Sequence, residues 1–97
     1  MAPKKTPQYV VVRTYSAGVH VGELVESAGK EVQLANARRI WNWQKRFTLH
    51  EVATAGVGEG SKVSVAVPGI LLTEAIEVIT CSDDGAKLLR EAKAYSP

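Results

Sequence analysis

Apolar and polar residues alternate along much of this chain with the two-residue period of β-strands. Residues 8–15 begin the pattern with a run of tyrosine and valine that has high β-propensity and is too short for a helix. Strict alternation resumes at Val19 and ends at Ser27-Ala-Gly29-Lys30, a sequence typical of a hairpin turn. We therefore predict that residues 17–26 and 31–43 pair as antiparallel strands.

The phase of this third strand is disturbed near its middle. Val32 and Leu34 point inward, and keeping their phase would place four more residues in the core: Asn36, Arg38, Ile40 and Asn42. A bulge near Asn36 would instead bring three other residues into phase with Val32 and Leu34, namely Arg39, Trp41 and Trp43. Either arrangement leaves an arginine near buried apolar groups, where a cation needs a partner. Such a conflict between local rules is typical of functional or interfacial sites.

Two short helices are predicted in the second half of the chain. Thr48 opens a capping box for a helix over residues 49–55, which Gly56 ends. Ser82 is the N-cap of an amphipathic helix from residue 83 to about residue 93, with acidic residues in its first turn and basic residues later.

Two further strands are predicted between these helices. Residues 62–67 alternate as a strand that Pro68-Gly69 stops. Residues 70–81 form the longest apolar stretch, and the isoleucine, valine and threonine at its end favour a strand. The segment from Glu74 to Glu77 could alternatively begin a helix.

These elements predict an α+β fold with a small, largely antiparallel sheet of about five strands and two short helices. The 97 residues match one domain, which we place at residues 8–97 after a flexible basic tail over residues 1–7. A core of this size gains stability from self-association, so we expect a homo-oligomer. No apolar stretch reaches the roughly 20 residues that cross a bilayer, so we expect no membrane partner and a cytoplasmic location.

Positive charge is concentrated in the first half of the chain. Residues 1–47 carry eight Lys and Arg and three Glu, whereas residues 48–97 carry four Lys and Arg and seven Asp and Glu. Both tryptophans lie in the basic half, which favours an anionic ligand. The basic residues do not form a long stripe, so nucleic acid is not the expected partner.

Groups for catalysis are sparse. The chain has two histidines, His20 and His50, and no His, Cys and Asp cluster with metal-ligand spacing, so we expect no metal and no cofactor. Ser16 precedes His20 without an acidic residue beside them to orient the ring. The single cysteine, Cys81, follows an apolar run and is expected to be a buried structural thiol. We therefore predict a protein that is not an enzyme.

Cations and aromatic rings instead indicate a binding site. Guanidinium groups form paired hydrogen bonds with phosphates, and ring faces stack on bases. The candidate ligand-binding residues are Arg13, Tyr15, His20, Arg38, Arg39, Trp41 and Trp43. Alternatively, both tryptophans are core or dimer-interface anchors with the arginines stacked over them.

Three segments together resemble a known family. They are Arg13-Thr-Tyr-Ser-Ala-Gly-Val-His20-Val-Gly22-Glu-Leu24, Asn36-Ala-Arg-Arg-Ile-Trp41-Asn-Trp43 and Ile70-Leu-Leu-Thr-Glu-Ala-Ile76-Glu. The chain resembles, over roughly residues 9–81, a family of short uncharacterised proteins encoded by tailed bacteriophages. It departs from that family's pattern after the tryptophans, where Gln44-Lys-Arg46 replaces a small Gly-Ala step.

This resemblance implies a phage accessory protein that acts in the host cytoplasm. The expected function is a small oligomeric protein that binds and sequesters an anionic nucleotide-like signalling molecule and so counters host defence. The alternative is a virion-associated or structural module, such as a capsid decoration or a head or tail component. Such a module would bind a phage or host protein through its basic tail and an exposed sheet edge, and would have no small-molecule ligand.

Overall fold

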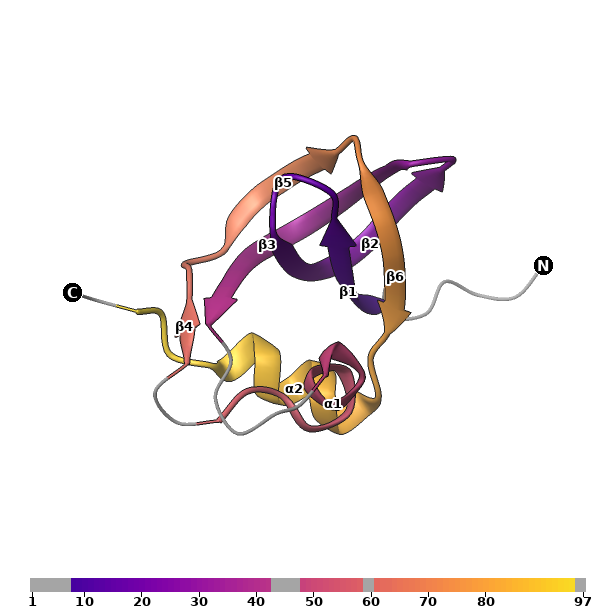
Figure 1. Cartoon of the computed structure of the whole chain (residues 1–97). Helices are drawn as coiled ribbons and strands as arrows, with labels where there is room; N and C mark the ends of the chain where they lie inside the picture. Colours follow the sequence, from indigo (N-terminus) through magenta and orange to yellow (C-terminus); the bar gives the residue numbers. More distant parts are fainter. Residues whose placement is uncertain (1–7, 43–47, 59–60, 96–97) are drawn as a thin grey trace.

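The computed structural model describes residues 8–42, 48–58 and 61–95 (Figure 1). Its elements follow the order β1 (Tyr9–Thr14), β2 (Val19–Ala28), β3 (Glu31–Asn42), α1 (Leu49–Ala55), β4 (Lys62–Val63), β5 (Val67–Leu72), β6 (Ala75–Thr80) and α2 (Asp83–Glu91). The predicted α+β fold with a mostly antiparallel sheet and two short helices is confirmed. The predicted tail over residues 1–7 lies outside the described residues.

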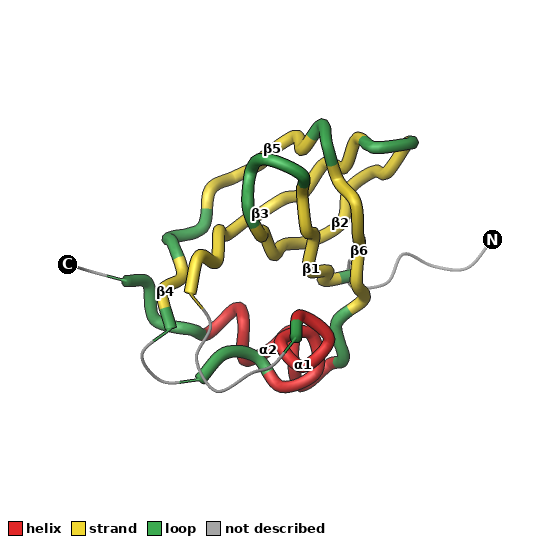
Figure 2. Tube along the Cα trace, viewed as in Figure 1, coloured by secondary structure: helices red, strands yellow, loops and turns green. Residues whose placement is uncertain are grey.

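The sheet has the strand order β4-β3-β2-β1-β6, and β5 also pairs with β3. Because β3 is long, its first half pairs with β5 and its last residues pair with β4. The two-residue turn from β5 to β6 is hydrogen-bonded to the residues that follow β1 and β2. The Glu74 carbonyl accepts from the N–H of Tyr15, and the Lys30 carbonyl accepts from the N–H of Ala75. Figure 2 shows both helices on one side of this sheet.

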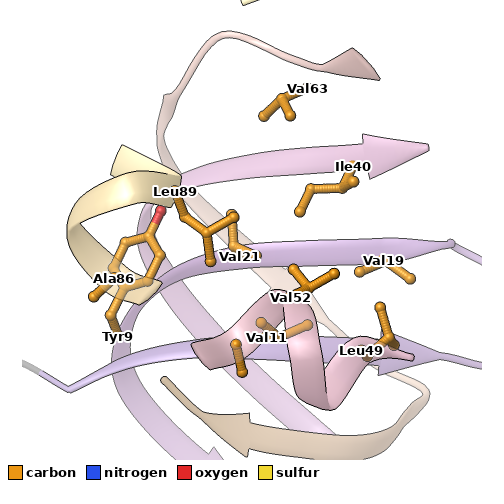
Figure 3. Close-up of a cluster of buried hydrophobic side chains, with 11 residues drawn as sticks. Tyr9, Val11, Val19, Val21, Ile40, Leu49, Val52, Val63, Ala86 and Leu89 are labelled. Atoms are coloured by element: carbon orange, nitrogen blue, oxygen red, sulfur yellow. The ribbon is translucent and has the colours of Figure 1, made fainter. Parts of the chain in front are cut away.

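Two apolar clusters cover the two faces of β1. On the side of the helices, Tyr9 and Val11 pack with residues from β2, β3, β4 and both helices (Figure 3). On the other side, Val10 and Val12 pack against residues of β3 and β5. This double burial explains why the first strand is a continuous apolar run rather than an alternating one.

The disturbed phase of the third strand is resolved by a bulge at Asn36. Asn36 has a φ of 51°, and the register of β2 against β3 shifts between Val21 and Glu23. Ala37 therefore joins the cluster that contains Val32 and Leu34. Of the two arrangements considered for this strand, the bulge is confirmed, and it places Arg39 and Trp41 on the same face of β3 as Ala37.

Both predicted helix starts are confirmed. The Thr48 side chain accepts from the N–H of Glu51 at 3.4 Å, and the Ser82 hydroxyl accepts from the N–H of Gly85 at 3.0 Å. The first helix ends at Gly56, where φ is 71° and the N–H donates to the Val52 carbonyl. The first turn of each helix thus has the N-cap hydrogen bond that the sequence pattern predicted.

The predicted strands of the second half need correction. Pro68-Gly69 does not stop a strand but lies inside β5, while β4 is limited to Lys62–Val63. Proline is tolerated there because β5 pairs with β3 alone among the described residues, so its outer edge needs no N–H donor. The predicted strand 70–81 is divided by the turn at Thr73-Glu74, and the alternative helix over 74–77 does not form.

Candidate functional site

The structure separates the predicted binding residues into several places. Arg38 is buried on the helix side of β3, and Arg39 lies on the opposite side. Arg13 lies on β1 and Trp41 on β3, two strands that β2 separates, and Arg13 follows Tyr9 and Val11 on the helix side of β1. Trp43 lies outside the described residues. The predicted residues therefore do not all share one face of the sheet.

Arg38 holds the end of α2. Its Nε donates to the Ser64 carbonyl at 2.8 Å, and its Nη1 donates to the Leu89 and Arg90 carbonyls at 2.8 and 3.2 Å. The last carbonyls of a helix lack intrahelical donors and carry partial negative charge, so a guanidinium stabilises them. This arginine, only 7% exposed, is a structural residue as well as a candidate ligand contact.

His20 and Arg39 are direct cross-strand partners on the other side of the sheet. His20 is buried, and its Nε2 donates to the Ala17 carbonyl at 2.9 Å. Burial lowers the pKa of the imidazole below its ordinary value of 6.5, and the nearby Arg39 charge lowers it further. Arg39 is exposed, with its guanidinium beside Gly18. Of these two predicted contacts, Arg39 is the one accessible to a ligand.

Trp41 belongs to an exposed group of rings and cations that we call the Trp41 surface. It consists of Trp41, Lys62, Tyr95 and Arg39, which precedes Trp41 by two residues on the same face of β3. The Trp41 and Tyr95 rings meet edge to face with centroids 5.8 Å apart, and they are 49% and 43% exposed. Lys62 Nζ lies 5.0 Å from the centroid of the Tyr95 ring. The Tyr95 N–H donates to the Val63 carbonyl, which holds the chain after α2 against β4.

Sequence reasoning missed Lys62 and Tyr95. Neither lies near Trp41 in sequence, and the pairing of β3 with β4 and the course of the chain after α2 bring them to it. The only sequence signal for Tyr95 is an aromatic residue just beyond the amphipathic helix.

Arg13 and Tyr15 contact different groups in the part of the chain that the structure describes. Arg13 Nη1 lies 3.5 Å from Glu77 Oε1 across the β1–β6 pair, and both side chains are largely exposed. Tyr15 follows the end of β1 and is exposed beside a cavity of about 310 Å³ that Lys30, Glu74 and Ile76 also line. The interpretation that Arg13 and Tyr15 share a face of one strand is wrong, because β1 ends at Thr14.

The described residues contain no group of three or more His, Cys, Asp or Glu arranged to hold a metal ion. The Ser16 hydroxyl donates to the Glu74 carboxylate, whereas His20 donates to a backbone carbonyl. Cys81 packs against the helix-side cluster, and burial raises its thiol pKa to about 11, which disfavours the reactive thiolate at neutral pH. Neither described helix is long and apolar enough to cross a membrane.

Comparison with known families matches residues 7–89 to a family described as a domain of unknown function, DUF6948. This chain belongs to that family. The DUF6948 match runs from just before β1 into α2, so it includes Arg39, Trp41 and Lys62, whereas Tyr95 lies beyond it. A search of curated proteins found no match, and a search of solved structures found none either.

Proposed function

We propose that this protein is a non-catalytic binding protein that sequesters an anionic, nucleotide-like molecule at the Trp41 surface. The observation that carries the proposal is the contact of two half-exposed rings, Trp41 and Tyr95, with a lysine ammonium beside one of them. Stacking of a base on an aromatic side chain contributes about 1–3 kcal/mol. Lys62 and Arg39 supply the cations that a phosphate group requires.

The biological setting of the proposal is a tailed bacteriophage. The resemblance of three sequence segments to phage-encoded proteins supports this setting, and the concentration of positive charge in residues 1–47 supports an anionic ligand. A phage protein that binds a nucleotide-like signal without converting it would counter host defence by lowering the free concentration of that signal. This role needs no catalytic group and requires only that the protein be abundant and bind tightly.

The test is thermal unfolding of the purified protein with linear and cyclic nucleotides and ADP-ribose. A ligand at 100 times its Kd adds about 2.7 kcal/mol to the free energy of unfolding and raises Tm by several degrees. Trp41→Ala and Lys62→Gln should abolish or sharply reduce that rise. Lys87→Gln is the matched control, because Lys87 is an exposed lysine on α2 away from the Trp41 surface.

An absent response to every nucleotide would overturn the proposal. So would a rise in Tm that Trp41→Ala leaves unchanged, because the ligand would then bind elsewhere.

A second candidate function is a protein-interaction module of the virion. The observation that favours it is the exposure of Ile76 (50%) and Val78 (42%) on β6, which pairs with β1 on one edge and with no other described strand. A free strand edge beside exposed apolar side chains is a surface that another chain can pair with. Association with phage particles, together with indifference to nucleotides, would favour this function.

A further inference from the structure

A second polar cavity lies where β1, the bulge of β3 and the end of α2 meet. Its volume is about 270 Å³, and it is lined by Tyr9, Glu23, Asn36, Arg38, Ala66 and Arg90. We call it the Tyr9 cavity. Arg38 and Arg39 are consecutive residues of β3 and point to opposite sides of the strand, so this cavity is distinct from the Trp41 surface.

The hydroxyl of Tyr9 is the unusual group in this cavity. Tyr9 is 4% exposed, and its Oη is a buried polar atom without a hydrogen-bond partner among the described residues. Its ring is fixed by the helix-side cluster, which Figure 3 shows beside α2, and by the Arg90 guanidinium 4.6 Å from its centroid. Burial raises the pKa of Tyr9 to about 12, so the hydroxyl keeps its proton and can donate it. A buried hydroxyl without a partner is costly, which favours a bound acceptor.

Two guanidinium groups face the same cavity. Arg38 uses Nε and Nη1 on backbone carbonyls, and its Nη2 has no partner among the described residues. Arg90 Nη2 lies 3.7 Å from Glu23 Oε2, which is longer than a good hydrogen bond, so this pair can open. Two cations and one carboxylate leave the lining with an excess of one positive charge, which a monoanion would balance.

We propose that the Tyr9 cavity binds a small molecule through an oxyanion, either a carboxylate or a phosphate. The Tyr9 hydroxyl and Arg38 Nη2 donate hydrogen bonds to the oxyanion. Arg90 turns from Glu23 towards the ligand, and the Asn36 side chain and Ala66 border the rest of it. The positions of both donors are set before binding, because Arg38 is held by α2 and Tyr9 by the core.

The experiment titrates the ¹⁵N-labelled protein with sodium acetate or inorganic phosphate at constant ionic strength and follows amide chemical shifts. Saturable shifts of the Asn36, Arg38 and Arg90 amides with either probe are the expected result. The probe that binds more tightly assigns the oxyanion as carboxylate or phosphate. Tyr9→Phe should weaken binding at least tenfold without loss of stability, because it removes only a hydroxyl that has no protein partner.

Two further variants complete the design. Tyr95→Phe is the matched control, since it removes a hydroxyl from the Trp41 surface, and it should leave the titration unchanged. Glu23→Gln should tighten binding several-fold, because it removes the carboxylate that repels the anion and competes for Arg90. Failure of both probes to give saturable shifts, or equal binding by Tyr9→Phe, would overturn the proposal. Neither outcome depends on whether nucleotides bind at Trp41.

Discussion

At the scale of the residue, two adjacent arginines contribute to stability to very different extents. Arg38 is buried and donates to three backbone carbonyls, whereas Arg39 is exposed. Arg38→Gln should lower the free energy of unfolding by about 3 kcal/mol, because it leaves the end of α2 without its donor. Arg39→Gln should change it by less than about 0.5 kcal/mol. Urea unfolding followed by circular dichroism measures both, and equal losses would contradict the structural role of Arg38.

His20 gives stability a specific dependence on pH. Its folded-state pKa is below the ordinary 6.5, so the folded protein binds fewer protons than the unfolded chain as the pH falls through that region. The free energy of unfolding should therefore decrease as the pH drops below about 6.5 and be fully restored above it. His20→Gln should reduce the difference between pH 5 and pH 7.5 in urea unfolding. His50→Gln, at an exposed histidine, should retain the difference; equal profiles for both variants would exclude His20 as the source.

At the scale of the element, the packing of α1 on α2 depends on one glycine. A Cβ at Gly85 would lie 1.9 Å from the Ala53 carbonyl oxygen, although alanine is otherwise the better helix former. Gly85→Ala should cost about 3 kcal/mol, a fall in Tm of more than roughly 10 °C. Gly69→Ala is the control, because its Cβ would lie 3.5 Å from the Leu34 carbonyl oxygen, an ordinary contact. A stabilised Gly85→Ala variant would show that the helices do not approach so closely.

The elements predicted well from sequence are those with local signals. Thr48, Gly56 and Ser82 mark helix ends through hydrogen bonds between near neighbours in the chain, and these ends are confirmed. Pro68 was misleading, because whether a proline interrupts a strand depends on which edge of that strand is paired. The pairing of β5 with β3 joins residues that are thirty to forty positions apart in the chain, and no local pattern encodes it.

At the scale of the whole molecule, the candidate site could also be predicted only in part, because it depends on contacts between residues far apart in the chain. Residue types suited to an anionic ligand could be chosen from sequence, and Arg39 and Trp41 remain in the proposed site. The role of Arg38 depends on carbonyls about fifty residues further along the chain, so sequence alone could not separate it from its neighbour. Lys62 and Tyr95 were missed for the same reason, since only tertiary structure brings them to Trp41.

The unpaired edge of β6 favours self-association of the whole molecule. β5 and β6 are joined by a short turn but pair with β3 and β1, not with each other, in the described chain. The unpaired edge of β6 and its exposed apolar residues would be covered if two copies paired through this strand.

We therefore expect the wild-type protein to be a dimer or larger oligomer in sedimentation analysis at micromolar concentration. Ile76→Lys should give a monomer with an unchanged circular dichroism spectrum, because a charge beside the edge opposes pairing. Val65→Lys places the same charge at an exposed apolar residue outside β6, and it should leave the oligomer intact. A wild-type protein that stays monomeric across the concentration range would exclude pairing through β6. It would also require that the nucleotide-like ligand be bound by the Trp41 surface of a single chain.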